Sequence, residues 1–267
     1  MTASHEHLAY ILRLADNALI LGQRNSEWCG HGPALEEDIA LTNISLDLIG
    51  TARLLYSHAA EIENALTGGR LSEDIYAYFR SEVEFRNYTL VELPNFGPLA
   101  GTAQSEKDYA VTIVRSFFYS ALMVCLWPVL EKSSDSKLAA IASKSIKEAR
   151  YHLDHSREWL VRFGDGTDES ERRAQAAIEY LFPYTLEFFT NDDVEASVAA
   201  SNLGPRTSDV ENQWRAIVDE AAREARLLIP EPVKYVTTGK LGEHSEHMGY
   251  LLAEMQSLAR EHPGSTW

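Results

Sequence analysis

The stretch that decides the fold is residues 135–163, DSKLAAIASKSIKEARYHLDHSREWLVRF. Steps of three and four residues along it select one continuous stripe, made of Leu138, Ile141, Ser145, Glu148, His152, His155 and Trp159. A stripe with this spacing is the face that a helix turns toward the core of a bundle. We therefore predict a helix over 135–163 that directs a carboxylate and two imidazoles inward.

Helical periodicity continues through the rest of the chain, and no alternating run predicts a strand. The helices predicted from apolar spacing cover 6–23, 34–64, 72–93, 107–131, 135–163, 168–190, 208–228 and 243–261. Mostly short connections rich in glycine or proline separate them, which is typical of antiparallel neighbours. The sequence predicts an all-α antiparallel bundle with additional flanking helices, in a single domain over 1–267.

Charge and composition exclude several classes of protein. The chain has 24 basic and 40 acidic residues, a formal charge of −16, which argues against nucleic-acid and anionic-membrane partners. The two cysteines, Cys29 and Cys125, are too far apart in sequence for a disulfide framework or a zinc knuckle. The uncharged stretch 116–130 is shorter than the roughly 18 apolar residues of a membrane span. With no secretory signal visible, we expect a soluble, cytoplasmic protein.

The acidic residues are concentrated in the segment 164–200, which has only two basic residues, Arg172 and Arg173. The acids there are Asp165, Asp168, Glu169, Glu171, Glu179, Glu187, Asp192, Asp193 and Glu195. This pattern is typical of solvated helix faces, and a docking surface for a basic partner is the alternative.

Other carboxylates lie in apolar surroundings and suggest a metal centre. Asp47 lies within the apolar run 39–50, and Glu84 and Asn87 lie on the predicted helix 72–93. A di-metal bundle takes a Glu from each of two helices and a Glu-x-x-His from each of two others. Here Glu84 is followed by an amide at that spacing, and the histidine expected after Glu148 is displaced by one position.

The predicted helix 107–131 decides against that template. From Tyr109 through Leu130 it carries no carboxylate, and its one charged residue there is Arg115. We therefore expect no metal, no catalytic residue and no bound cofactor, and interpret the inward residues as a hydrogen-bonded polar network. The members of this predicted network are Asp47, Glu84, Asn87, Glu148, His152 and His155. A working metal site, or a mononuclear site built on Glu148 and His152, is the alternative.

The C-terminal segment 242–247, GEHSEH, combines two histidines with two acids. A metal site is one interpretation, although acids at a helix N-terminus are explained by the helix dipole alone. Lys240, between two glycines, is a weak candidate for a phosphate contact.

With these residues in view, the chain resembles the structural (C) subunits of bacterial phenylacetyl-CoA epoxidase complexes. The resemblance extends from Leu8 to Trp267. It rests on SEWCGHGP (26–33), the stretch 38–50, LVELPN (90–95), KEARYHL (147–153), GDGT (164–167), EHSEH (243–247) and LAEMQ (252–256). It implies a ferritin-like fold and a homologous catalytic subunit that carries a di-iron centre and binds the CoA thioester. It also implies a reductase with a flavin and an iron–sulfur cluster that takes electrons from NADPH.

The function implied is that of a non-catalytic structural subunit of a multicomponent phenylacetyl-CoA monooxygenase in phenylacetate catabolism. The candidate surface for the catalytic subunit includes Phe118, Tyr119 and Trp127, and a place in the core is the alternative for most of them. Two alternatives stay open: a self-sufficient di-iron oxidase or iron-binding protein, and a bundle that binds a small molecule through Lys240 and the C-terminal histidines.

Overall fold

The computed structural model describes residues 5–99, 107–232 and 234–265. These residues form helices and short helical turns, and their β-structure is limited to an isolated bridge between Thr238 and Glu243. The chain divides into two compact units. The first contains 1–93, 193–200 and 238–267, and the second contains 94–192 and 201–237. The all-α prediction is confirmed, whereas the single-domain assignment stays a prediction.

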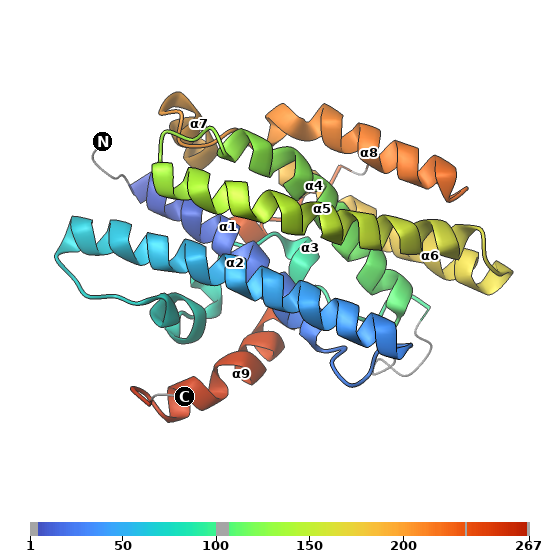
Figure 1. Ribbon diagram of the computed structural model, residues 1–267, viewed down its shortest axis with the longest axis horizontal. Helices are drawn as coiled ribbons and strands as arrows, with labels where there is room; N and C mark the ends of the chain where they lie inside the picture. The colour runs from blue at the N-terminus through green and yellow to red at the C-terminus, as the bar shows by residue number, and fades with distance from the viewer. Residues whose placement is uncertain (1–4, 100–106, 233, 266–267) are drawn as a thin grey trace. The chain divides into compact units, whose positions relative to one another are not determined.

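Two long helices dominate the first unit, α1 (His5–Ser26) and α2 (Leu35–Thr67), which lie side by side (Figure 1). A Cβ added at Gly22 would lie 3.0 Å from Cγ1 of Ile49, so glycine there allows α1 to approach α2 closely. The unit's shorter elements are a π-helical turn (Ile75–Phe79), a 3-10 turn (Glu82–Glu84), α3 (Thr89–Glu92), α7 (Asp193–Ala200), a 3-10 turn (Gly239–Leu241) and α9 (Glu246–Glu261).

The prediction of one helix over 72–93 is wrong, because side chains of α1 take the backbone donors of this segment. Oδ2 of Asp16 accepts from the N–H of Arg86 at 2.8 Å. Oδ1 of Asn17 accepts from the N–H of Tyr88, also at 2.8 Å. Backbone groups held by these tertiary contacts cannot continue an α-helix, so only short turns and α3 form.

The second unit is organised around α4 (Tyr109–Leu130), which packs against α5 (Ser136–Gly164), α6 (Asp168–Leu181) and α8 (Glu211–Glu224). Asp108 and Asp135 cap the N-termini of α4 and α5. Helix α4 is apolar and long enough to cross a membrane, but 83% of its most apolar window is buried inside the protein. It is a core helix, as the sequence predicts.

Of the two alternatives for the aromatic residues of α4, partner surface or core, the structure shows the core. Phe118, Tyr119 and Trp127 are all buried. Phe118 packs against the indole of Trp214, which also donates from Nε1 to the carbonyl oxygen of Phe118 at 3.0 Å. These aromatic side chains belong to the core of the second unit because the helix that carries them is surrounded by three others.

Other boundaries also differ from the prediction. The segment predicted as one helix over 168–190 is α6 followed by a 3-10 turn (Phe182–Phe189), because Pro183 lacks the N–H that would continue the helix. Helix α8 starts at Glu211 after a 3-10 turn (Thr207–Val210) rather than at 208. The short helix α7 was not expected.

Candidate functional site

The six residues of the predicted inward network are divided between the two units. Asp47, Glu84 and Asn87 belong to the first, and Glu148, His152 and His155 belong to the second. Whether the two sets form one network therefore stays a prediction.

Glu84 does not point inward, so the prediction for this residue is wrong. Its side chain is exposed and accepts from the N–H and the hydroxyl of Ser81, at 2.7 and 2.6 Å. These two hydrogen bonds lower the pKa of the Glu84 carboxyl, because they stabilise its charged form. Glu84 is a capping residue of the turn Glu82–Glu84, which replaces the helix expected there.

Asn87 is fully buried, as predicted, and it leads to a cluster that the sequence pattern did not reveal. Its Nδ2 donates to Oε2 of Glu92 at 2.8 Å. Nδ1 of His244 lies 2.7 Å from the same oxygen, and the N–H of Ser245 donates to Oε1 at 2.5 Å. We name these four residues the Glu92 cluster. Asn87 and the segment 242–247 each stood out in the sequence, but no spacing connected them to each other or to the acid flanked by apolar residues at 90–93.

The Glu92 cluster joins three separate segments of the first unit. Arg24 on α1 donates from Nε to the carbonyl oxygen of Glu92 at 2.8 Å, and from Nη2 to that of His247 at 3.1 Å. The side chains of Glu92 and His244 are both excluded from solvent. Protein donors therefore occupy both carboxylate oxygens, and the arrangement holds the start of α9 against α3.

On α5, four of the seven residues of the predicted inward stripe are buried and the other three lie toward one side of the buried face. His152 is buried together with Leu138, Ile141 and Ser145, whereas Glu148 and His155 are only partly buried. Oε1 of Glu148 lies 3.7 Å from Nζ of Lys144 on the same helix. Asp47, on α2, is also only partly buried.

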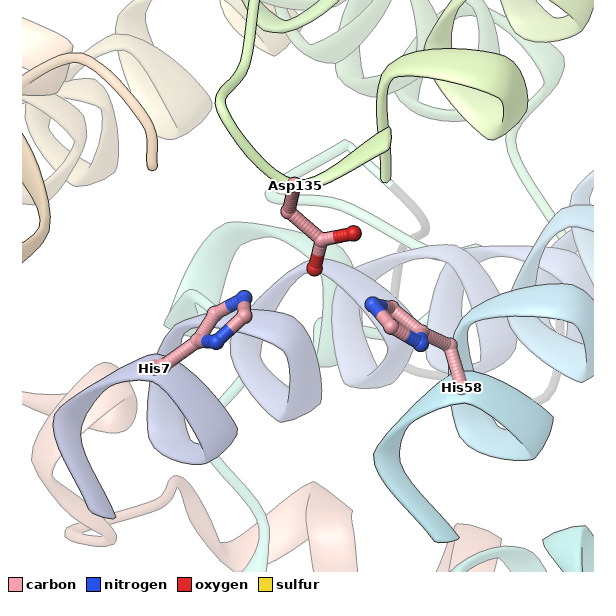
Figure 2. A group of neighbouring side chains, drawn as sticks. All are labelled: His7, His58 and Asp135. Atoms are coloured by element: carbon pink, nitrogen blue, oxygen red, sulfur yellow. The ribbon is translucent and has the colours of Figure 1, made fainter. Parts of the chain in front are cut away.

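Two further buried histidines were not predicted. Figure 2 shows His7 on α1 and His58 on α2, with ring centroids 6.2 Å apart in an edge-to-face arrangement. Both side chains are more than nine-tenths buried. The third residue labelled in that figure, Asp135, belongs to the second unit, where it caps α5. No spacing within one helix could have indicated this pair, because its two members come from different helices.

Lys240 is not placed to contact a phosphate. Its Nζ lies 3.0 Å from Oε1 of Glu195, which also accepts from Nη1 of Arg13 at 3.2 Å. All three side chains are buried. The weak sequence signal at Lys240 therefore marks an internal ion pair. Glu195 belongs to the acidic segment 164–200, so that segment is not wholly a solvated face.

A di-iron centre does not fit the residues of α4, which the structure describes throughout. The helix carries no carboxylate, and its single cation, Arg115, is completely buried. Nη1 of Arg115 donates to the carbonyl oxygen of Pro94 at 3.4 Å, and Nη2 donates to Oδ1 of Asn95. A guanidinium fixed inside the core opposes a second cation nearby, because like charges repel strongly where water is excluded.

The described residues form an all-α protein. Its helix α4 lacks the acid that the di-metal template requires from each helix of the bundle. Comparison with known proteins identifies the family to which this all-α protein belongs. The family model described as phenylacetic acid catabolic protein matches residues 1–267, and the chain belongs to that family. The family is ferritin-like, which confirms the fold class expected from the resemblance.

A curated relative is the C subunit of 1,2-phenylacetyl-CoA epoxidase of Escherichia coli (strain K12). It is 44% identical over 259 residues, which cover 97% of this chain and 98% of the relative. The relative and the chain therefore correspond over nearly their whole lengths.

Proposed function

We propose that this chain is the non-catalytic structural subunit of a 1,2-phenylacetyl-CoA epoxidase in phenylacetate catabolism. The observation that carries the proposal is the 44% identity to the C subunit of such an enzyme over nearly the full length of both chains. The lack of a carboxylate along the whole of α4, every residue of which is described, supports the non-catalytic role, since the di-metal template needs an acid from every helix of the bundle.

The partner in this proposal is a homologous subunit that holds the di-iron centre and binds the CoA thioester. A reductase with a flavin and an iron–sulfur cluster delivers electrons from NADPH to that subunit. This chain holds none of these cofactors, acts in the cytoplasm, and contributes by association. Buried ion pairs and the Glu92 cluster hold the segments of the first unit together, which supports a stable surface there for a partner.

The test is co-expression of the chain with the homologous di-iron subunit from the same organism, followed by size-exclusion chromatography and iron analysis. We expect an equimolar complex with about two irons per pair, and no stoichiometric iron in the isolated chain. About two irons per isolated chain, with an oxygen-sensitive absorbance, would instead identify a self-sufficient di-iron oxidase. Titration calorimetry of the isolated chain with phenylacetyl-CoA should give no binding heat, because Lys240 is paired internally.

A further inference from the structure

Helix α2 carries an apolar stripe on the face opposite to the one that packs against α1. Steps of three and four residues connect Leu35, Ile39, Asn43, Leu46, Gly50 and Leu54, which we name the outer stripe. The exposed fractions of Leu35, Ile39 and Leu46 are 73, 53 and 61%. The opposite face, with Leu41, Leu48 and Leu55, is buried.

A helix that is apolar on two opposite faces is ordinarily covered on both. Single exposed leucines are common on protein surfaces, but four large apolar side chains on one face over five helical turns, interrupted by Asn43 and Gly50, indicate an interaction site. Within the first unit, the long helix packed against α2 is α1, which covers the inner face. The outer stripe is therefore the side of α2 on which a partner is expected.

Gly50, in the middle of the outer stripe, points to close approach by a backbone. Glycine inside a helix is less favourable than alanine, so it needs a reason. A Cβ added at Gly50 would meet no atom within 4 Å, and its backbone is helical. Gly22 differs, because its missing side chain makes room for Ile49 of the same chain. No described neighbour within this chain requires glycine at position 50, whereas a helix of another chain packed closely over it would.

Charge on α2 distinguishes between possible occupants. Over the length of the outer stripe the helix carries four acids, Glu36, Glu37, Asp38 and Asp47, against a single arginine. That arginine, Arg53, already has its Nε 3.3 Å from Oε1 of Glu73. A second copy packed in parallel would place these acids against one another, and any second copy has the same net charge of −16, which is unfavourable. A different chain with Lys and Arg around an apolar centre is complementary.

We propose that the outer stripe of α2 is the docking surface for the homologous di-iron subunit. That subunit would present a helix with an apolar face, basic residues at its rim and its backbone close to Gly50. This inference rests on the proposed function, and it adds the surface and the chemistry of its partner.

The experiment measures the affinity of purified variants for the di-iron subunit and the melting temperature of each isolated variant. Leu46→Gln should weaken binding at least tenfold without lowering the melting temperature, because Leu46 is exposed in the isolated chain. Leu258→Gln is the matched control: Leu258 is 54% exposed, lies on α9 and should bind as the wild type does.

Gly50→Ala gives a second readout that loss of structure cannot imitate. It should raise the melting temperature of the isolated chain, since alanine favours the helix and meets no neighbour there. It should at the same time weaken the complex, because the added methyl group keeps the partner's backbone away. Association of the wild type should also slow at higher salt.

The outcomes separate the two proposals. If the wild-type chain and the di-iron subunit form no complex, the proposed function is overturned together with this surface. If the wild-type complex forms and both Leu46→Gln and Gly50→Ala bind with unchanged affinity, only the outer stripe is overturned. Sedimentation that shows a dimer of the isolated chain, lost in Leu46→Gln, would assign the stripe to a second copy instead.

Discussion

The ring of His244 lies between two acceptors, with Nδ1 at 2.7 Å from Oε2 of Glu92 and Nε2 at 3.1 Å from the carbonyl oxygen of Phe85. Neither a carboxylate nor a carbonyl donates a hydrogen bond, so both ring nitrogens must donate, which only the imidazolium form does. Burial opposes that charge, but the hydrogen bond to Glu92, its negative charge and the Phe85 carbonyl outweigh it and raise the pKa of His244.

This pair predicts a stability that depends on pH. Because the pKa of His244 is higher in the folded protein, its contribution is complete below the unfolded value of about 6.5 and is lost as pH rises through the folded value. We therefore expect the free energy of unfolding to fall as pH is raised above about 6.5. In His244→Gln that decline should be absent. Urea unfolding at a series of pH values measures both.

His247 provides the control, because its pKa is shifted the other way. Burial, and then the positive charge of Arg24, lower the pKa of His247, so its contribution is present above about 6.5 and is lost as pH falls. His247→Gln should change the pH dependence below about 6.5 and leave the decline above it intact. A His244→Gln variant that keeps the wild-type decline would show that the Glu92 pair does not cause it.

The buried pair of Asp16 and Arg80 predicts a large loss on truncation. Nη1 of Arg80 donates to Oδ2 of Asp16 at 3.1 Å and Nη2 donates to Oδ1, while the hydroxyl of Tyr56 donates to Oδ1 at 2.5 Å. Asp16 is completely buried. Arg80→Ala leaves this carboxylate without its counter-charge, so we expect a loss of about 3–5 kcal/mol in the free energy of unfolding. Urea denaturation measures it.

Arg53→Ala is the matched control for that experiment. Arg53 also pairs with an acid of the first unit, but its side chain is largely exposed. The change should be less than about 0.5 kcal/mol, because exposed ion pairs contribute little. Arg80→Lys should fall between wild type and Arg80→Ala, since lysine keeps the charge but loses the two-pronged contact. Equal effects of Arg80→Ala and Arg53→Ala would contradict the role given to burial.

Sequence reasoning succeeded where the deciding information is local. The absence of an acid from Tyr109 through Leu130 is visible in the sequence itself, and so is the apolar character that makes α4 a core helix. The inward position of His152 followed from spacing along a single helix. Apolar periodicity within one element predicts these features directly.

Prediction from sequence failed where the interacting residues lie far apart along the chain. The segment 72–93 has a helical pattern, but Asp16 and Asn17, about seventy residues earlier, take its N–H groups. Glu92 is matched by His244, more than a hundred and fifty residues later. Leu46 lies in the apolar run 39–50, and spacing alone does not say which of two apolar faces of a helix is packed.

The two cysteines predict a clear difference in thiol reactivity. Cys29 is exposed, whereas burial raises the pKa of the Cys125 thiol to about 11. Since the thiolate is the reactive form, a thiol reagent at pH 8 should modify one cysteine rapidly and the second only after unfolding. Cys29→Ser should abolish the rapid phase and Cys125→Ser should leave it unchanged. Two rapid equivalents in the folded wild type would contradict the burial of Cys125.

Gly164, the last residue of α5, predicts a destabilising alanine variant within the second unit. A Cβ at this position would lie 1.8 Å from the carbonyl oxygen of Ala225, so backbone must move to admit it. We expect Gly164→Ala to lower the free energy of unfolding by about 1–3 kcal/mol, the usual cost of overpacking.

Gly50→Ala is the matched control. It is expected to raise the free energy of unfolding by about 0.4–1 kcal/mol, because its added methyl group meets no atom. The same chemical change should thus have opposite signs at two helical glycines, because space is available at one and absent at the other. A gain in stability at both positions would contradict the close contact between Gly164 and Ala225.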